Sequence, residues 1–183
     1  MFEITEENAL PDRKDEIQVS ELHFVNKKNI RNYSLQDFSE VLLGLGCFWG
    51  AEKGFWKLPG VVTTAVGYAG GDTKNPTYNQ VCSGKTGHTE VVRVVWDKSI
   101  IDLSDLLKMC WECHDPTQGN RQGNDRGTQY RSAIYTYNEK HKGLAIDSLN
   151  SYQKKLNKEG YGSITTEVKS GQTFYFAEEY HQQ

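Results

Sequence analysis

The segment GCFWG sets a cysteine between a glycine and two large aromatic residues. Cys47 follows Gly46 and precedes Phe48, Trp49 and Gly50, where an apolar strand pattern changes to a helical one. Free N–H groups and the dipole at a helix N-terminus stabilise a thiolate, so we expect the pKa of Cys47 to be lowered. The glycines allow close approach of backbone or substrate, and the two rings would line an apolar pocket beside the sulfur. An isolated thiol is usually a core residue, but this tight cluster favours a nucleophile.

Glu90 is the second residue that simple packing does not explain. In a strand it shares one face with His88, Val92, Val94 and Trp96. A carboxyl group on that face would be partly buried, its pKa would be raised, and near pH 7 it could donate a proton. The alternative is a glutamate that faces water from an edge strand, with His88 as a polar neighbour, and the pattern does not choose between the two.

Two polar segments offer further groups for chemistry. Tyr78 and Cys82 lie in NPTYNQVCSG, and Asp125, Arg126 and Tyr130 lie in NRQGNDRGTQYRS. Tyrosine hydroxyls can donate hydrogen bonds to an oxygen while their rings rest against apolar groups. Each residue alone indicates little, because a single tyrosine usually packs and an aspartate in such a loop usually stabilises a turn.

The segment CWECH has the spacing of a covalent haem attachment site. Cys110, Cys113 and His114 match both C-x-x-C-H and a redox C-x-x-C pair. Cys110, however, falls on the apolar face of a predicted helix, and Met109 is too close to be a distal haem ligand. We therefore interpret the two cysteines as packing residues and His114 as the residue that ends the helix. No second ligand pair at suitable spacing supports zinc.

Length and composition bound the remaining possibilities. The chain has 183 residues, four cysteines and a formal net charge of −3. This favours one domain, with residues 1–37 as an N-terminal arm that packs on a catalytic domain formed by residues 38–183. No apolar run is long enough to span a membrane, and no basic footprint indicates nucleic acid. The acidic start MFEITEENAL is unlike a secretory signal, so we expect a cytoplasmic protein with reduced thiols.

Strand and helix patterns alternate irregularly along the chain, which favours an α+β sandwich over a doubly wound parallel sheet. Residues 1 to about 37 are polar and weakly patterned, and a disordered tail is the alternative for the first dozen or so. We predict strands at 40–46, 61–69, 88–96, 130–137 and 163–168, and helices at 47–56, 102–113 and 138–158.

Taken together, these segments resemble the A-type peptide methionine sulfoxide reductases. The blocks GCFWGAE, GYAGG, NPTYNQVCSG, TGHTEVVRV, HDPTQGNRQGNDRGTQYRSAIY and FYFAEEYHQQ are similar to those of that family and occur in its order. The likeness is dense from about residue 43 to 137 and thinner elsewhere. It implies an α+β two-layer sandwich with a mixed, mainly antiparallel sheet of ferredoxin-like type.

The resemblance also implies a reaction, the thiol-dependent reduction of methionine S-sulfoxide, free or in peptides and proteins, to methionine. Cys47 would attack the sulfoxide sulfur as a thiolate, and Glu90 would give a proton to the sulfoxide oxygen. Tyr78 and Tyr130 would hydrogen-bond that oxygen. Cys47 would become a sulfenic acid, the first oxidised state of a thiol. The thiol carries the redox change, so no metal or organic cofactor is expected.

Other residues acquire roles from the same resemblance. Phe48 and Trp49 would hold the substrate methyl group, with Gly46 beside them, and Asp125 would position the polar side of the site. In the family a second thiol resolves the sulfenic acid to a disulfide, and thioredoxin or another thiol is the reductant. Members often carry a recycling cysteine in a glycine-rich tail beyond YHQQ.

Which thiol performs that step here stays open at the sequence level. Cys82 lies within a family block, whereas Cys110 and Cys113 stand where the family has other residues. A disulfide with Cys47 needs Cα atoms within ~7 Å or a moving loop. An enzyme with a single working thiol, regenerated by an external thiol, is also compatible with the sequence.

Three rival functions are compatible with parts of the pattern. A cysteine hydrolase would use Cys47 with His88 or His114 as base, form an acyl-thioester and consume no reductant. An electron carrier built on CWECH would show the absorption band of haem. A non-catalytic interaction domain would leave Cys47 with ordinary thiol reactivity.

Overall fold

The computed structural model describes residues 8–183, so residues 1–7 of the expected arm lie outside the described residues. The strands are β1 (Phe38–Gly44), β2 (Val61–Ala69), β3 (Thr89–Asp97), β4 (Arg121–Gln122), β5 (Asp125–Arg126), β6 (Ala133–Thr136), β7 (Glu167–Ser170) and β8 (Tyr175–Phe176). The helices are α1 (Phe48–Phe55), α2 (Tyr78–Cys82), α3 (Leu103–Cys113) and α4 (Glu139–Lys158), with short 3₁₀ turns at Thr128–Tyr130 and Glu179–His181.

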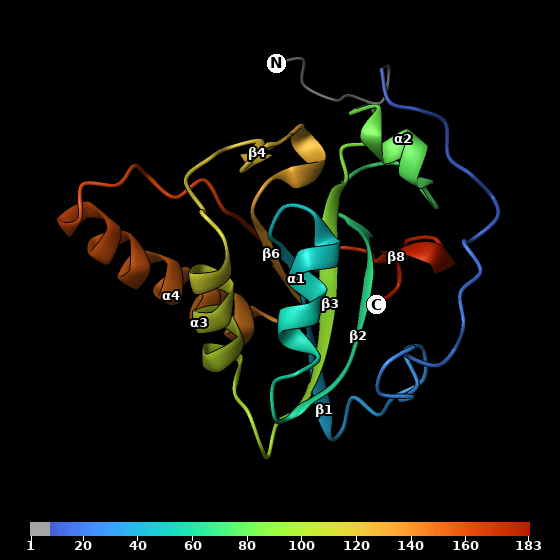
Figure 1. The fold of residues 1–183 in the computed structure, drawn as a ribbon, viewed down its shortest axis with the longest axis horizontal. Coiled ribbons are helices and arrows are strands. Elements are labelled where there is room, and N and C mark those ends of the chain that lie inside the picture. The colour runs from blue at the N-terminus through green and yellow to red at the C-terminus, as the bar shows by residue number, and fades with distance from the viewer. Residues whose placement is uncertain (1–7) are drawn as a thin grey trace.

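The main sheet is mixed and mainly antiparallel, which confirms the predicted fold class. Its strand order is β7-β6-β1-β3-β2-β8, and only the β6–β7 pair is parallel. Helix α4 makes the crossover between those two strands, as a parallel connection requires. Helix α1 packs on the sheet next to β3 and runs roughly along the strands, and α3 and α4 stand side by side next to it (Figure 1).

Both faces of the central strands are covered, which explains the continuous apolar run of β1. Val41 and Leu43 point to the large core beneath the helices, whereas Leu42 joins a smaller cluster on the opposite face. On that opposite face the guanidinium of Arg93 lies 4.5 Å from the Phe174 ring centre and donates to the carbonyl of Ile30. The arm and the C-terminal segment thus form the second cover.

Residues 8–37 run along the domain and bond to widely separated parts of it. The N–H of Leu10 donates to the Lys85 carbonyl over 3.0 Å, and that of Ser20 to Glu179 over 2.7 Å. His23 is fully buried and its Nε2 lies 3.0 Å from the Thr64 hydroxyl. The division into an arm and a catalytic domain remains a prediction.

The structure departs from the predicted elements at four short places. Helix α2 was not predicted, although Thr77 and Gln80 form a capping box at its start. The loop that follows α3 contains the β4–β5 hairpin, and β8 has only two residues. The last predicted strand is displaced: the N–H of Thr165 donates to Pro116, outside the sheet, and pairing begins only at Glu167.

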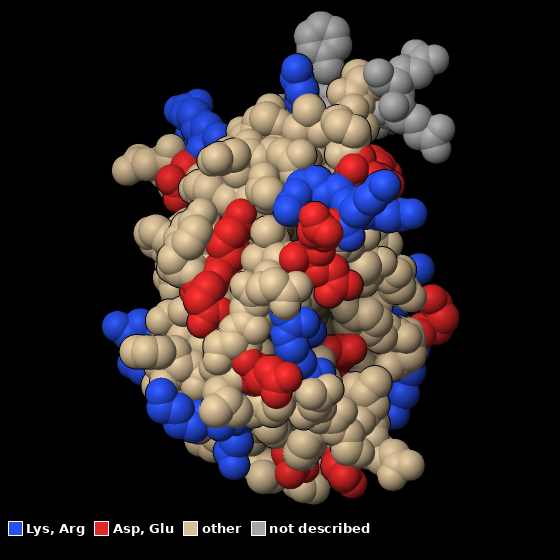
Figure 2. Space-filling view, turned by 90° about the vertical axis from the view of Figure 1, so that its right-hand side faces the viewer, with Lys and Arg blue, Asp and Glu red and all other residues tan. Residues whose placement is uncertain are grey.

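No helix within residues 8–183 combines the length and the apolar character needed to cross a bilayer. Charged side chains of both signs are mixed over the face that Figure 2 shows, with broad uncharged areas between them.

Candidate active site

Cys47 lies at the junction between β1 and α1. It is the N-cap residue of α1, is partly exposed, and lies close enough to the backbone N–H groups of Trp49 and Gly50 for them to favour its thiolate form. Gly46 makes the turn possible: its φ is +88°, and a Cβ there would lie 2.6 Å from the Cβ of Gln122. The sequence therefore needs glycine before the cysteine for conformation and space.

Glu90 lies directly against the cysteine turn. Its side chain is 2% exposed, and its Oε2 accepts the backbone N–H of Phe48 over 3.1 Å. Burial raises the pKa of Glu90 to about 7, with a further contribution from the charge of Asp125, while the Phe48 N–H opposes the shift. The predicted burial and raised pKa are confirmed, and the water-facing alternative is wrong.

The pKa of Cys47 contradicts the sequence-based expectation. Burial raises the pKa of the thiol, and the negative charges of Glu90 and Asp125 raise it further, although the N–H groups of Trp49 and Gly50 act in the opposite direction. The helix N-terminus does favour the thiolate, as expected, but desolvation and two nearby carboxylates outweigh it. Both Cys47 and Glu90 therefore hold their protons more firmly than free side chains would.

Aromatic rings from three elements meet beside Cys47, with His181 at their centre. The ring of His181 lies 5.3 Å from Phe48, 5.6 Å from Trp49 and 4.6 Å from Tyr78, measured between ring centres. Trp49 donates its indole N–H to His181 Nδ1 over 3.1 Å. Phe48 is 2% exposed, whereas Trp49 is 58% exposed. An apolar group bound here would contact a buried ring and a partly open one.

Sequence reasoning missed His181 and Glu178, which build the C-terminal wall of this corner. Glu178 accepts the Tyr68 hydroxyl and the Tyr78 backbone N–H, each over 2.9 Å, and so fixes the start of α2. The available signal was the block FYFAEEYHQQ, whose close-set acidic, aromatic and histidine residues received no role.

Asp125 and Tyr130 reach the same corner from the loop that follows α3. Asp125 is exposed on β5, and its charge raises the pKa of both Cys47 and Glu90. Burial raises the pKa of Tyr130, and the charges of Glu90, Asp125 and Cys47 add to the effect. The five residues predicted to act in catalysis are thus close enough to influence one another's pKa values. They are Cys47, Tyr78, Glu90, Asp125 and Tyr130.

The other cysteines differ in their access to this corner. Cys82 is exposed and lies beside the Tyr78 hydroxyl, and the charge of Glu90 acts on it. Cys110 is fully buried in α3, and the exposed Cys113 contacts the Cys110 carbonyl. All four cysteines are free thiols. Burial of Cys110 also places its sulfur out of reach of a haem vinyl group.

Neither candidate histidine base is available to Cys47. His88 accepts the Gly71 N–H at Nδ1 and contacts the Thr73 carbonyl at Nε2 over 2.7 Å. His114 is held in the same way between the Cys110 carbonyl and the Ser132 hydroxyl, both at 2.7 Å. Burial lowers the pKa of both rings. With both ring nitrogens engaged elsewhere, the geometry does not support a cysteine hydrolase.

Comparisons with known proteins agree with this geometry. The family model for peptide methionine sulfoxide reductase matches residues 39–183. A peptide methionine sulfoxide reductase MsrA of Vibrio parahaemolyticus is 56% identical over 180 residues, which are 98% of this chain and 85% of that protein. Methionine sulfoxide reductase A of Corynebacterium diphtheriae has a similar structure, with a TM-score of 0.92 and 43% identity over 98% of this chain and 88% of that one. Reduced Mxr1 of Saccharomyces cerevisiae also has a similar structure, with a TM-score of 0.76 and 33% identity over 82% of this chain and 86% of that one.

Proposed function

The chain belongs to the peptide methionine sulfoxide reductase family, and from this premise we propose how its residues perform the reaction. It is an oxidoreductase that reduces methionine sulfoxide to methionine with electrons from thiols. The observation that carries the residue assignment is the contact between Glu90 and the cysteine turn. A carboxyl group with a pKa of about 7 accepts the N–H of Phe48, the residue after the thiol.

Cys47 is the nucleophile in this proposal. Its sulfur attacks the sulfoxide sulfur and forms a transient S–S bond. The oxygen then passes from the substrate sulfur to Cys47, so that the substrate S–O bond breaks and an S–O bond to Cys47 forms, and the S–S bond breaks as methionine leaves. The substrate sulfur gains two electrons, and Cys47 becomes a sulfenic acid. Glu90 gives a proton to the departing oxygen and takes up the proton that the thiol releases, so no net proton is consumed.

The surrounding side chains stabilise and orient the substrate. Tyr78 and Tyr130 supply hydroxyl donors for the sulfoxide oxygen, where negative charge grows as the S–O bond weakens. Phe48 and Trp49 hold the methyl group in the aromatic corner that His181 completes. Asp125 is exposed on the polar side, where its charge helps to keep Glu90 protonated. Protein-bound and free methionine S-sulfoxide both fit this scheme.

We assign the resolving step to Cys82. It is exposed, lies beside the Tyr78 hydroxyl, and is within the electrostatic neighbourhood of Glu90 and Tyr130. Attack of its sulfur on the sulfenic acid would form a Cys47–Cys82 disulfide and release water. Cys110 is a poor alternative because it is fully buried. The thiol of Cys113 donates to the backbone carbonyl of Cys110 in α3.

A dithiol reductant then returns both cysteines to thiols. We propose thioredoxin, or another thiol of the same chemistry, as that partner. Mxr1 of Saccharomyces cerevisiae has been solved in complex with Trx2. Because the cycle consumes thiols, we place the enzyme in the cytoplasm, where thiols are kept reduced.

Separated sulfoxide epimers test the proposed reaction. The enzyme is incubated with dithiothreitol and with either the S or the R epimer of N-acetylmethionine sulfoxide, and the methionine product is quantified. We expect the S epimer to be reduced and the R epimer to remain. Reduction of the R epimer alone, or of neither, would contradict the proposal.

A further inference from the structure

A groove runs away from the catalytic corner along the exposed side of α1. One wall is formed by Trp49, Lys53 and Trp56, which are spaced four and three residues apart and so share a face of the helix and its last turn. The opposite wall is the C-terminal segment Tyr180–Gln183. Together these residues enclose a space of about 420 Å³.

The C-terminal wall is held firmly in place. The side chain of Gln182 bonds both the N–H and the carbonyl of Val66, at 3.0 and 2.9 Å, and so pairs like a strand residue with the sheet. Gln183 bonds the buried carboxylate of Glu52 through its backbone at 2.9 Å and through its side chain at 3.1 Å. The chain end therefore lies fixed beside β2 (Figure 1), and the bonds to Glu52 also hold it to α1. A ligand would meet a preformed groove, which lowers the entropic cost of binding.

The groove is continuous with the catalytic corner because Trp49 and His181 belong to both. Two of its rings are unusually open for their size: Trp49 is 58% exposed and Tyr180 is 72% exposed. Large exposed aromatic surfaces next to a reactive group are typical of sites that bind another molecule.

Lys53 carries the only charged side chain of the lining. It is exposed, and within residues 8–183 it makes no ion pair. Burial lowers the pKa of His181, so that ring is neutral near pH 7. The carboxylate of Glu52 lies below the groove, 1% exposed and bonded to Thr64 and Gln183. A ligand bound in the groove would therefore contact aromatic rings and one unpaired cation, the ammonium group of Lys53.

We propose that this groove binds the peptide segment next to the oxidised methionine and selects an acidic residue there. The inference rests on the proposed function, because it takes the catalytic corner as the place of the sulfoxide. Seven residues of helix rise ~10 Å, and an extended peptide rises ~3.3 Å per residue. The groove thus spans about three peptide residues, with apolar side chains on the rings and one carboxylate at Lys53.

Charge reversal at Lys53 tests this selection. We would measure kcat/KM for two matched peptides that carry Asp or Lys at each of the three positions on one side of methionine S-sulfoxide, and then on the other side. Each value is divided by that for N-acetylmethionine sulfoxide. The unaltered enzyme should prefer the acidic peptide about two- to fivefold, the range of an exposed ion pair. Lys53→Glu should reverse the preference, and added salt should weaken both effects.

Lys57→Glu is the matched control, because Lys57 is an exposed lysine of the same segment that does not line the groove. It should leave the preference unchanged. Equal reduction of acidic and basic peptides by the unaltered enzyme, or an equal response to both substitutions, would overturn the inference. Failure to reduce N-acetylmethionine sulfoxide would instead count against the proposed function, so the two failures are distinguishable.

Discussion

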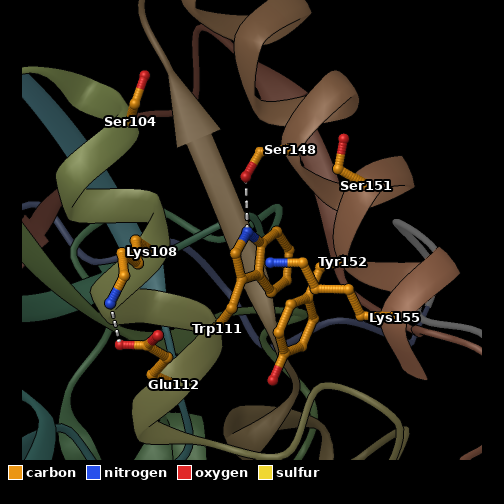
Figure 3. Close-up of a pocket in the computed structure, with 8 residues that line it drawn as sticks. All are labelled: Ser104, Lys108, Trp111, Glu112, Ser148, Ser151, Tyr152 and Lys155. Atoms are coloured by element: carbon orange, nitrogen blue, oxygen red, sulfur yellow. Dashed lines mark hydrogen bonds and ion pairs between the residues drawn. The ribbon is translucent and has the colours of Figure 1, made fainter. Parts of the chain in front are cut away.

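A second groove, between α3 and α4, is lined by residues that include Lys108, Trp111 and Tyr152. Like the corner around Cys47, it holds a tryptophan beside a polar partner, but the two regions differ in whether their polar groups are all paired. In the α3–α4 groove, Trp111 stacks on Tyr152 with 5.6 Å between ring centres and donates its indole N–H to Ser148 over 2.8 Å (Figure 3). Lys108 pairs with Glu112 over 2.7 Å. The indole N–H of Trp111 and the charges of Lys108 and Glu112 thus each have a partner within the groove.

The Cys47 corner differs because it contains ionisable groups with shifted pKa values and a buried polar atom without a hydrogen-bond partner. Glu90 is buried with a pKa of about 7, the pKa of the Cys47 thiol is raised, and the hydroxyl of Tyr78 lies beside a second thiol, that of Cys82. His181 Nε2 is buried without a hydrogen-bond partner in the described part of the chain. The comparison teaches that a group whose pKa is shifted toward neutral pH, such as Glu90, marks a site for chemistry better than a groove lined by aromatic residues does.

We expect the largest effect on activity from substitution of Cys47, and none from a substitution in the α3–α4 groove. Cys47→Ser should reduce methionine formation to background, because a hydroxyl in its place is a far weaker nucleophile. Ser148→Ala, in the α3–α4 groove, should leave kcat and KM unchanged. Product assays with dithiothreitol measure both variants. Substantial turnover by the serine variant would show that another group attacks the sulfoxide.

Glu90→Gln should have the next largest effect. The amide keeps the shape and still accepts the Phe48 N–H, but it cannot donate a carboxyl proton. We expect the single-turnover rate to fall about 100- to 1,000-fold, with little change in substrate affinity. Rapid-quench measurement of methionine provides the rate. An unchanged rate would remove Glu90 from proton donation.

The pH dependence should sharpen the assignment further. The pKa of Glu90 is raised to about 7, so its proton-donating form is present below that pH and is lost above it. The single-turnover rate should therefore decline as pH rises through about 7, against the gain that Cys47 makes as it ionises. The declining limb should be missing in Glu90→Gln. A limb that persists in that variant would belong to another group.

The smallest effect is expected in the α3–α4 groove. Trp111→Phe removes the indole N–H that bonds Ser148 and part of the stack on Tyr152. We expect about 1–2 kcal/mol less free energy of unfolding in urea titrations and the same kcat/KM. A marked loss of kcat at unchanged stability would mean that the two regions are coupled.

The sequence predicted the long elements well and the short ones poorly. Strands β1 to β3 and helices α3 and α4 have extended apolar patterns, so period alone located them. Helix α2 has five residues and β8 has two, too few for any period to show. The Thr77–Gln80 capping box was the one local signal for α2.

Residue types were predicted better than energies at the site. Cys47 and Glu90 each stood out in its own segment, but the hydrogen bond that joins their segments spans 42 positions and has no local pattern. The pKa of Cys47 was predicted in the wrong direction because the helix N-terminus is visible in sequence, whereas burial and the charge of Asp125 are not. For the same reason His181, 132 positions from Trp49, received no role.

Chemical trapping of the oxidised thiol tests the central claim most directly. A Cys82→Ser variant, which would lack the proposed resolving thiol, is mixed with one equivalent of methionine S-sulfoxide and a sulfenic-acid reagent, without reductant, and its peptides are analysed by mass spectrometry. We predict about one methionine per protein molecule and the adduct on Cys47 alone. Methionine without an adduct on Cys47, or an adduct on Cys110 or Cys113 instead, would contradict the account.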